Sequence, residues 1–504
     1  MAARPHHIVA ARLCLQGRPA KRYQRADGGL PVAAKLPTRT ATPPKRRYRD
    51  VEAVEKDPSN RWGRWRAGHV GRLSRRQFVK TAAAASAVFA VPQVIPSSAL
   101  GKDGAVAPSE RIVMGGIGIG RRGSYDLSCF LPNADVQFVA ICDVKEERRQ
   151  AVKKIADERY GNDDCAMYRD FRELLDRDDI DAVLIATGPN WHATAATYAA
   201  RAGKDMYCEK PCTKNITQSL QLAETMRRTG RVFQVGTQRR NLPHFAFACE
   251  LARTGRLGTL RRVYAHPAGM TQKMSGWLPA EDAPPIEVVD WDMYLGPAAW
   301  RPFNNVMLNG FHFEKGGGFM GCFEEDGSFS GGGVLEWGSH CVDLCQWAAG
   351  ADGTAPVEYN PPQDGEIVAR YANGVELILR EKDWLPLGSC PVRFEGDDGW
   401  VETGDSGKFV LSSPELLAGR TVEEIGGYPA TFHVRDFLDC VKTRNKPKGD
   451  ADTACFAHIA CHAANIALLL DRQVNYDLAK HEFIDDAEAN RLRGEALRAP
   501  WRIM

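Results

Sequence analysis

Two short stretches of the sequence carry side chains suited to proton transfer. In the first, GGGVLEWGSH, Glu336 and His340 are four residues apart, so a helix would place them one turn apart on the same face. A carboxylate beside an imidazole can orient the ring and stabilise the imidazolium that forms when the ring takes a proton. Asp343, three residues further on, is a second candidate for orienting His340. A histidine packed on a helix face beside solvated acids would have the same spacing, so the surrounding elements must decide.

The second stretch is CEKP, where an apolar strand-like run ends in Glu209 and Lys210. In open α/β folds, ligands bind at the carboxyl edge of the sheet, so Lys210 would bring an amine to a ligand site. Glu209 can hold or tune that amine, and Pro211 stops the strand. A lysine before a surface turn is the alternative for any single residue of this type.

A glycine motif supplies the first element able to position Lys210. RIVMGGIGIGRRG places a short β-type run before Gly118, Gly120 and Gly123, a spacing that permits a tight turn and close backbone approach to a pyrophosphate. A second strand-like run, VQFVAICDV, ends in Asp143, where an acid would accept hydrogen bonds from an adenosine ribose. The glycines alone are a weak signal, but with these two runs they predict a dinucleotide-binding half.

Asp143 also bears on the choice of cofactor. A carboxylate at this position repels the 2′-phosphate of NADP, so the sequence favours NAD. Lys145, Arg148 and Arg149 follow closely and could soften that preference, although the same residues would suit the solvated face of a helix. NAD is therefore the expected cofactor and NADP the alternative.

Strand-like runs recur along the chain with helical stretches between them. After the glycine motif come DAVLIATGP, DMYCEKP and RVFQVGTQ. This alternation predicts a parallel, doubly wound sheet, and so an α/β fold with a Rossmann domain over 109–236. Residues 237–504 are expected to form a second α/β domain for substrate binding and oligomerisation, and residues 100–108 a linker.

The segment at 70–99 has the pattern of an export signal. SRRQFVK matches the twin-arginine consensus, and it precedes the small-residue apolar run TAAAASAVFAV and a cleavage position after Ala99. The sequence therefore predicts recognition by the twin-arginine export machinery and a periplasmic location. Residues 1–69 are rich in Arg and Pro and aperiodic, which predicts either a disordered extension or translation that begins near Val70 or Leu73.

Charge and cysteine usage argue against two classes of function. The chain has 66 basic and 63 acidic residues, but 20 of the basic ones lie before residue 100. The remainder is acidic, so no nucleic-acid partner is expected. The 14 cysteines include no CxxC pair and mostly lie in apolar runs, so they predict small buried side chains rather than disulfides or a metal site.

Beyond these motifs, the chain from 109 to 504 resembles the glucose–fructose oxidoreductase, inositol dehydrogenase and rhizopine-catabolism (Gfo/Idh/MocA) family. The resemblance rests on GIGIGRRG, ICDV, DAVLIATGPNWHA, AGKDMYCEKP and VFQVGTQRR, and then on DWDMYLGPAAWRPFN, GGGVLEWGSHCVDLCQW and HVRDFLDCVKTRNKP. It implies an N-terminal Rossmann domain and a C-terminal α/β domain with a mostly antiparallel open sheet. That sheet often forms the interface of a dimer or tetramer, so the resemblance implies a homo-oligomer.

The resemblance also implies a set of site residues. The cofactor-binding positions are Gly118, Gly120, Arg122, Gly123, Asp143, Thr187, Asn190, His192, Glu209, Lys210 and Gln238. His340 matches the family's proton-transferring residue beside the cofactor lysine, which makes Lys210, His340 and Glu336 the expected catalytic set. This sequence departs from the family at Gly188, where proline is common, and at Glu336, where aspartate is more usual. The second departure weakens the expectation that Glu336 contacts substrate.

Other side chains are candidates for the substrate site. Arg239 and Arg240, after the last Rossmann strand, could bind hydroxyls or a carboxylate, or pair with acids. His266 and Asp343 could face the same pocket. The aromatic-rich DWDMYLGPAAWRPFN could wall a sugar site or pack in an oligomer interface. The Gly-rich stretch at 313–333 resembles either a mobile lid or a long insertion.

These inferences predict an NAD(P)-dependent oxidoreductase that moves a hydride to or from a secondary carbinol of a sugar, polyol or cyclitol. Because the twin-arginine route carries folded proteins and the periplasm has essentially no NAD(P) pool, the cofactor is expected to be tightly bound and regenerated in place. Two alternatives stay open: a glycosidase or lyase that oxidises and re-reduces one sugar, and a non-catalytic sugar-binding protein. GGGVLEWGSH differs from the Tyr- and Thr-containing segment of exported glycosidase relatives, which favours the oxidoreductase.

Overall fold

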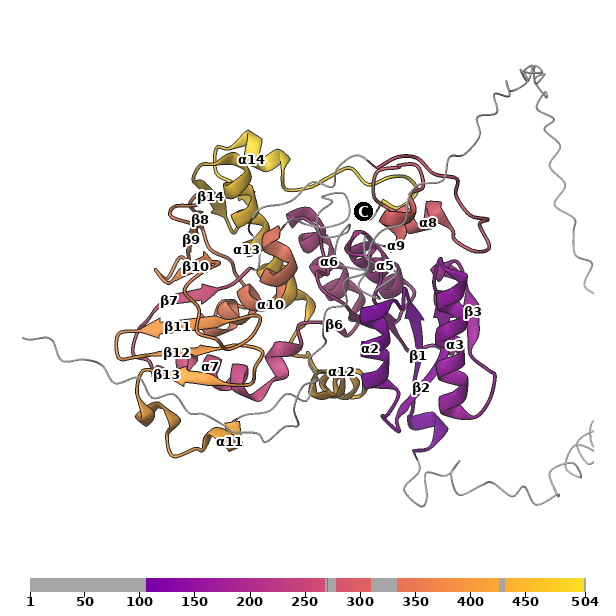
Figure 1. Cartoon of the computed structure of the whole chain (residues 1–504), viewed down its shortest axis with the longest axis horizontal. Coiled ribbons are helices and arrows are strands. Elements are labelled where there is room, and N and C mark those ends of the chain that lie inside the picture. Colours follow the sequence, from indigo (N-terminus) through magenta and orange to yellow (C-terminus); the bar gives the residue numbers. More distant parts are fainter. Residues whose placement is uncertain (1–105, 268–269, 271–277, 310–332, 426–430, 503–504) are drawn as a thin grey trace, which may run out of the picture. The chain divides into compact units, whose positions relative to one another are not determined.

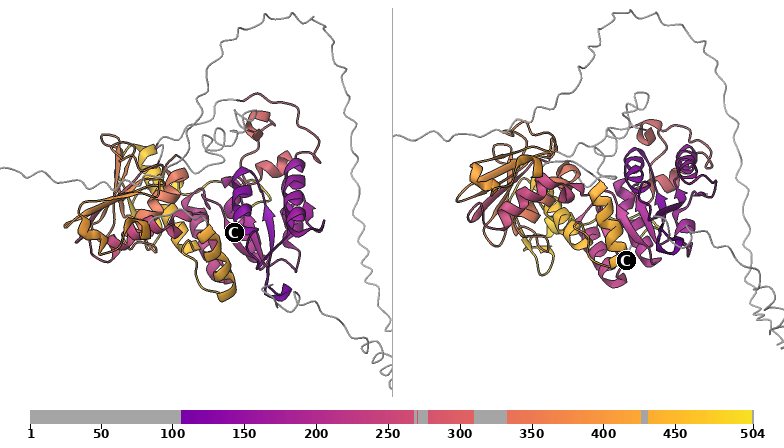
Figure 2. Two further views of the ribbon diagram at one scale, coloured as in Figure 1. Left: turned by 60° about the horizontal axis from the view of Figure 1, so that its bottom comes forward. Right: turned by 90° about the horizontal axis from the view of Figure 1, so that it is seen from below.

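The structure is a computed structural model of the 504-residue chain, and it describes residues 106–267, 270, 278–309, 333–425 and 431–502. The expected signal at 70–99, the residues before it and most of the linker lie outside the described residues, as does nearly all of 313–333. The described residues form two β-sheets with helices packed on them (Figures 1 and 2).

The first sheet has six strands in the order β3-β2-β1-β4-β5-β6, all paired in parallel. The strands are β1 (Ile112–Ile117), β2 (Val136–Cys142), β3 (Ala166–Tyr168), β4 (Ala182–Ile185), β5 (Asp205–Cys208) and β6 (Phe233–Val235). The helices between them are α2 (Arg121–Phe130), α3 (Glu146–Tyr160), α4 (Phe171–Leu175), α5 (Pro189–Arg201) and α6 (Ile216–Thr229). This confirms the doubly wound sheet, whose winding reverses between β1 and β4 and so opens a ligand crevice there.

Local sequence explains where several of these elements lie. The strand β4, Ala-Val-Leu-Ile, is buried throughout, as a parallel strand covered on both faces must be. Asn215 caps α6 by accepting a hydrogen bond from the backbone N–H of Gln218. Gly161 ends α3 in the left-handed conformation that glycine adopts most readily.

The second sheet has nine strands in the order β13-β12-β11-β7-β10-β9-β8-β14-β15, and only β7 and β10 pair in parallel. Its strands are β7 (Leu260–Ala265), β8 (Glu358–Tyr359), β9 (Glu366–Arg370), β10 (Glu376–Arg380), β11 (Val392–Gly396), β12 (Trp400–Thr403), β13 (Phe409–Leu411), β14 (Val474–Asp477) and β15 (Glu482–Phe483). The mostly antiparallel sheet expected for the second half is therefore confirmed.

Three helices pack on this sheet: α7 (Pro243–Arg253), α10 (Gly333–Ala348) and α13 (Ala451–Leu470). By length and composition α13 could cross a membrane, but 78% of its apolar window is buried inside the protein, as expected of a core helix. The twelve cysteines in the described residues are all buried and none forms a disulfide, which agrees with their placement in apolar runs.

The chain returns to the first sheet after completing most of the second. α12 (Thr431–Thr443) packs on α2, with Val434 and Phe437 inside the Rossmann core, and Trp501 is buried beside Trp191. The shorter helices are α8 (Trp291–Leu295), α9 (Asn305–Asn309), α11 (Val422–Ile425) and α14 (Ala487–Arg491), with 3-10 turns η2 (Pro108–Glu110), η3 (Gln238–Asn241) and η5 (Pro414–Leu417). The expected boundary near 236 thus separates the two sheets but not the two hydrophobic cores.

Candidate active site

The turn between β1 and α2 requires glycine at two positions. Gly118 has a φ of +71°, and a Cβ there would lie 2.3 Å from Thr187 Cγ2, just after β4. A Cβ on Gly123 would lie 2.9 Å from that of Ala186. The turn therefore lies against the end of β4, and α2 begins directly after Gly120, where its first backbone N–H groups suit an anion.

Asp143 follows β2 and is only 4% exposed. Its Oδ1 accepts a hydrogen bond from the backbone N–H of Lys145 at 2.9 Å, whereas its Oδ2 has no partner among the described residues. Burial raises the pKa of Asp143, and the positive charge of Arg148 opposes that rise. A buried carboxylate oxygen without a donor fits a ribose hydroxyl, so this position suits the sugar of an adenosine group.

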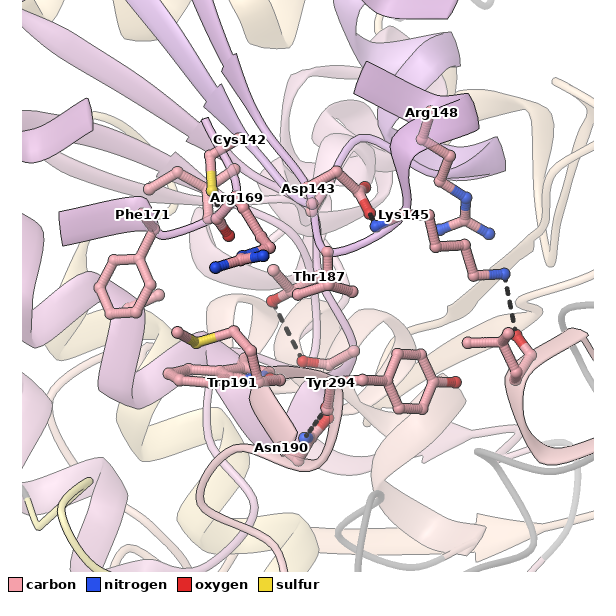
Figure 3. Close-up of a pocket in the computed structure, with 18 residues that line it drawn as sticks. Cys142, Asp143, Lys145, Arg148, Arg169, Phe171, Thr187, Asn190, Trp191 and Tyr294 are labelled. Atoms are coloured by element: carbon pink, nitrogen blue, oxygen red, sulfur yellow. Dashed lines mark hydrogen bonds between the residues drawn. The ribbon is translucent and has the colours of Figure 1, made fainter. Parts of the chain in front are cut away.

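A cavity lies beside this acid, and we call it the Asp143 cavity (Figure 3). Its walls include Thr187 near the glycine turn, Phe171 and Trp191 from the helices of the first sheet, and Tyr294 from α8. In Figure 3, Trp191 and Tyr294 lie along the side of the cavity opposite Asp143. An aromatic cavity beside an acid suits a purine base and its ribose, so the residues present fit the adenosine half of NAD.

A second cavity shares Ala186 and Thr187 with the first, and we call it the Lys210 pocket. The first half of the chain lines it with Gly120, Arg121, Arg122, Pro189, His192, Glu209, Lys210, Gln238 and Arg239, and α10 adds Glu336, Trp337 and His340. The expected catalytic set therefore meets in one pocket. The two cavities are therefore neighbours at the end of β4, and we call them together the groove. A dinucleotide binds at this edge in such sheets.

Lys210 extends its amine from the end of β5 to α10. Its Nζ donates hydrogen bonds to the backbone carbonyl of Glu336 at 3.0 Å and to Glu336 Oε2 at 3.3 Å. The carboxylate of Glu336 is therefore bound to the lysine, whereas the helical spacing suggested that it orients His340. An ammonium is a stronger hydrogen-bond partner for a carboxylate than a neutral imidazole, which explains the difference.

Glu209 lies beneath Lys210 and gathers several donors. Its Oε2 accepts from the backbone N–H of Lys210 at 3.1 Å, and its Oε1 accepts from Gln238 Nε2 at 2.8 Å and Arg122 Nε at 3.1 Å. Burial alone would raise the pKa of Glu209, but the charges of Arg122 and Lys210 outweigh it and lower that pKa. Glu209 therefore stays a carboxylate and holds the neighbouring cations in place.

His340 is buried in α10, on the wall of the Lys210 pocket. Burial lowers the pKa of His340 well below its ordinary value, and the charges of Arg239 and Lys210 lower it further. Its Nδ1 has no hydrogen-bond partner in the part of the chain that the structure describes. The ring is therefore neutral near neutral pH and can accept a proton from a group bound in the pocket.

Asp343, the other acid considered for orienting His340, is also bound elsewhere. Its Oδ2 accepts from Arg240 Nε at 2.7 Å, and the same guanidinium reaches Asp352 Oδ1 at 2.7 Å. The guanidinium offers charged donors that the neutral imidazole lacks, so Asp343 joins α10 to the turn after β6 instead. Asp343 and Arg240 hold the catalytic helix but do not line the Lys210 pocket.

Two of the weaker substrate candidates have other contacts. Arg239 lines the Lys210 pocket, and its guanidinium donates to both oxygens of Asp405, at 3.1 Å and 2.7 Å, so pairing with an acid is the role present. His266 does not line the pocket among the described residues. Its ring lies 6.1 Å from that of Trp384, and its carbonyl accepts from Cys341 Sγ.

The remaining cofactor candidates connect the walls of the groove. The ring nitrogens of His192 lie 2.7 Å from the carbonyl oxygen of Pro211 and 3.0 Å from that of Thr187. Asn190 Nδ2 donates to the carbonyl of Leu295, the last residue of α8, at 3.0 Å. These contacts hold the loops after β4 and β5 together and attach α8 to them.

Some wall residues were missed or placed differently by sequence reasoning. Trp337 lines the Lys210 pocket, with the guanidinium of Arg239 5.7 Å from its ring centre, but no motif singled it out. The stretch DWDMYLGPAAWRPFN, considered for a sugar site or an oligomer interface, supplies Tyr294 to the Asp143 cavity. Lys145 was considered part of a solvated helix face, yet it is buried and its Nζ donates to Asn309 Oδ1 at 2.7 Å. In the sequence, only the aromatic content of DWDMYLGPAAWRPFN indicated that this stretch lines a site.

Two relatives among characterised and named proteins share part of this sequence. The chain is 32% identical over 176 residues to glycosyl hydrolase family 109 protein 1 of a Shewanella species, and 31% identical over 176 residues to an alpha-N-acetylgalactosaminidase of Shewanella oneidensis. Each match covers 31% of this chain and 38% of the relative, so it spans well under half of the relative's length.

A solved structure shares the fold more widely. The WlbA dehydrogenase of Bordetella pertussis, solved in complex with NADH and UDP-GlcNAcA, matches with a TM-score of 0.53 over 73% of this chain and 98% of that one. At 16% identity this likeness concerns the fold alone.

Two family models account for both halves of the chain. Residues 111–237 match the NAD-binding Rossmann fold of the Gfo/Idh/MocA oxidoreductase family, and residues 267–503 match an oxidoreductase-family C-terminal alpha/beta domain. These matches agree with the six-stranded parallel sheet, the nine-stranded mixed sheet and the groove between Asp143 and Lys210. The chain therefore belongs to the Gfo/Idh/MocA family of oxidoreductases, with an NAD-binding Rossmann domain.

Proposed function

We propose that this protein is an enzyme that transfers a hydride between NAD and a secondary carbinol carbon of a sugar, polyol or cyclitol. The observation that carries the proposal is the meeting of Lys210 and a neutral His340 in one pocket that adjoins the Asp143 cavity. A cation and a neutral base at the reacting end of a dinucleotide groove suit the oxidation of an alcohol.

The Lys210 pocket supplies a proton acceptor and a donor that stabilises the developing charge in that oxidation. When bound, the nicotinamide ring supplies the hydride acceptor at its C4. His340 takes the hydroxyl proton, so the alcohol loses a hydride from carbon and a proton from oxygen and becomes a carbonyl. Lys210 donates to that oxygen as negative charge develops, while Glu336 holds its amine and Glu209 holds its backbone N–H. Reduction of a carbonyl uses the same transfers in reverse.

Asp143 supports NAD over NADP in this proposal. The unpartnered carboxylate oxygen would accept a hydrogen bond from the ribose and would repel a 2′-phosphate. Arg148, the neighbouring cation, lies close to the glycine turn, with its Nη1 2.9 Å from where a Cβ on Gly120 would be. We therefore assign Arg148 to the pyrophosphate.

Trp337 supports a carbohydrate or cyclitol as the substrate. Its side chain lines the Lys210 pocket beside His340, with the two ring centres 6.1 Å apart. An indole face can pack on the apolar C–H face of a sugar ring while the polar groups of the pocket meet its hydroxyls.

We further propose that the dinucleotide is a resident cofactor of an exported enzyme. SRRQFVK supports the twin-arginine route, which carries proteins already folded. An enzyme outside the cytosolic dinucleotide pool must return its cofactor to the starting state in every cycle. Oxidation of one substrate followed by reduction of a second would close that cycle.

The two named relatives favour a second candidate, a glycosidase or lyase. Transient oxidation of a ring hydroxyl would acidify a neighbouring C–H and permit elimination of the aglycone. Water would then add and the stored hydride would return to the same sugar, with no net redox change. Because the match covers 38% of those relatives, this activity ranks second.

One experiment separates these functions. The protein, purified without added cofactor and dialysed, is offered sugars, polyols, cyclitols and aryl glycosides while bound dinucleotide and released aglycone are followed. The proposal predicts reduction of the bound dinucleotide by at least one alcohol and its reoxidation by a second carbonyl substrate. Aglycone release without net reduction would establish the second candidate. Binding of a sugar with neither change would contradict both and favour a non-catalytic binding protein.

A further inference from the structure

One side of the Asp143 cavity is formed by residues far from the Rossmann domain in sequence. The segment 278–309, which we call the strap, follows β7 and contains α8 and α9. It contributes Met293, Tyr294 and Leu308 to the cavity wall. The adenosine end of the groove is therefore completed by the strap and not by the Rossmann domain alone.

The strap is fastened to the loop that carries Asp143. The backbone N–H of Asp290 donates to the carbonyl of Val144 at 3.1 Å, and that of Glu146 donates to the carbonyl of Val288 at 3.0 Å. Lys145 adds its Nζ, which donates to the carbonyl of Leu308 at 3.2 Å. These contacts hold the strap on both sides of α8.

The strap is fastened a second time to the first turn of α5. Trp191 Nε1 donates to the carbonyl of Met293 at 2.8 Å, and Asn190 Nδ2 donates to that of Leu295. Gly296 lies so close that a Cβ there would be 2.1 Å from the indole of Trp191. An adenosine group in the cavity would therefore lie between Asp143 and a wall that depends on Trp191.

Arg498, near the end of the sequence, contacts the same part of the strap. Arg498 donates from Nε to the carbonyl of Gly296 at 2.8 Å, and from Nη1 and Nη2 to Asp292 Oδ1 at 2.5 Å and to the Asp292 carbonyl at 2.7 Å. Its own backbone N–H donates to the carbonyl of Pro297 at 3.0 Å. A single arginine thus binds four carbonyl or carboxylate groups of α8 and the two residues that follow it.

Trp501 supports the same cavity wall by packing on Trp191 and Phe171. It is 3% exposed, and its ring packs edge-on to Trp191 with centroids 4.7 Å apart and lies 6.1 Å from Phe171. Both partners line the Asp143 cavity. The segment that carries Trp501 is also held at Glu495, whose Oε1 lies 2.7 Å from Lys214 Nζ.

We infer that the tail, residues 493–501, supports the dinucleotide site and controls how fast NAD leaves it. Movement of the strap away from α5 opens the adenosine end of the groove, and the contacts of Arg498 and Trp501 oppose that movement from outside the cavity. The inference rests on the proposal of a resident NAD and names the part of the chain that would make it resident. Its ligand is the adenosine half of the dinucleotide.

The test measures release of bound NADH after addition of excess NAD, followed by nicotinamide fluorescence. Trp501→Ala and Arg498→Ala in the full chain are expected to speed release about tenfold, which corresponds to about 1.4 kcal/mol. Trp501→Phe should restore most of the retention. Trp300→Ala, at a 64% exposed position on the strap, and Arg502→Ala, beside Trp501 and exposed, are the matched controls and should change release less than about twofold.

The half of the ligand affected gives a second readout. ADP-ribose should leave the Trp501→Ala and Arg498→Ala proteins faster by a similar factor, whereas the affinity for nicotinamide mononucleotide should stay the same. Unchanged NADH release in either variant, with its circular dichroism and unfolding midpoint retained, would overturn the inference. Arg498→Ala keeps the test valid if Trp501→Ala does not fold. No carbohydrate is needed, so a failure to find a substrate would count against the proposed function alone.

Discussion

The two ends of the groove are built in different ways. The Lys210 pocket is made of charged and polar residues that lie inside motifs, such as CEKP and GGGVLEWGSH, each at the end of a strand or on one helix. The Asp143 cavity has one motif acid, and its other walls combine the cations Lys145, Arg148 and Arg169 with aromatic side chains from α4, α5 and the strap, which the tail supports. The proposed chemistry therefore depends on a few residues, whereas retention of the cofactor depends on contacts spread over distant segments.

The comparison implies that the two properties can be altered separately. Lys210 and His340 should govern the rate of the chemical step with little effect on the dinucleotide. Asp143, Tyr294 and the tail should govern the affinity and lifetime of the dinucleotide with little effect on the chemical step. Substitutions at each end therefore test whether the rate of the chemical step and the binding of the dinucleotide change independently.

The largest effect is expected at the reacting end. Lys210→Met keeps the apolar stem of the side chain but removes the donor to the developing oxygen charge, so kcat should fall by about a thousandfold. The Kd for NADH, measured by fluorescence titration, should change by less than about threefold. Lys154→Met, at an exposed position on α3, should leave both quantities as they are. A parallel loss of NADH binding in Lys210→Met would contradict the separate control of chemistry and binding.

The next effect tests whether the reacting end also depends on distant support. Asp343→Asn leaves the buried guanidinium of Arg240 without its buried carboxylate and should lower the free energy of unfolding by about 3 kcal/mol. Asp352→Asn removes the partly exposed partner of the same arginine and should cost under about 1 kcal/mol. Chemical denaturation of both variants checks this order, and an equal cost would mean that burial does not set the strength of this network.

At the other end, Asp143→Ser should weaken the binding of NAD and improve that of NADP. Loss of a charged hydrogen bond to the ribose should raise the Kd for NAD about tenfold, while removal of the repulsive charge lowers that for NADP. Asp163→Ser, an exposed position after α3, serves as the control. The rate of hydride transfer in the fully loaded variant should match that of the unaltered protein, and a large drop in that rate would contradict the separation.

The smallest effect is in the pH dependence of the chemical step. The neutral form of His340 accepts the proton, and its pKa lies well below the ordinary 6.5, so this form persists as the pH falls through 6.5. The rate of bound-cofactor reduction should therefore stay level between about pH 8 and pH 6, where an ordinary histidine would lose about fourfold. Stopped-flow measurement on the preloaded enzyme excludes effects on NAD binding. A decline centred on pH 6.5 would show that His340 is not held in the neutral form.

Sequence reasoning predicted the local parts of this structure well. The parallel sheet, the glycine turn and the acid after β2 follow from runs and spacings within short windows, and the structure has each of them. The helix over Glu336 and His340 is present too, within α10. These features depend on neighbours in the chain, which the sequence displays directly.

The partners of Glu336 and Asp343 could not be predicted in the same way. Helical spacing indicates which side chains share a face, but Lys210 and Arg240 reach α10 from positions 126 and 103 residues away in the chain. The strap and the tail are similar cases, because Trp191, Gly296 and Trp501 meet only in the folded chain. Contacts of this kind leave no periodic pattern in the sequence.

The central claim is that a hydride passes between a carbinol carbon and the dinucleotide held in this groove. Its most direct test uses the alcohol found active in the substrate panel, carrying deuterium at the oxidised carbon, with mass analysis of the dinucleotide recovered from the enzyme. The account predicts one deuterium in the nicotinamide ring for the unaltered protein, and far less after the same time for Lys210→Met. Product formed while the recovered nicotinamide carries no deuterium would contradict it.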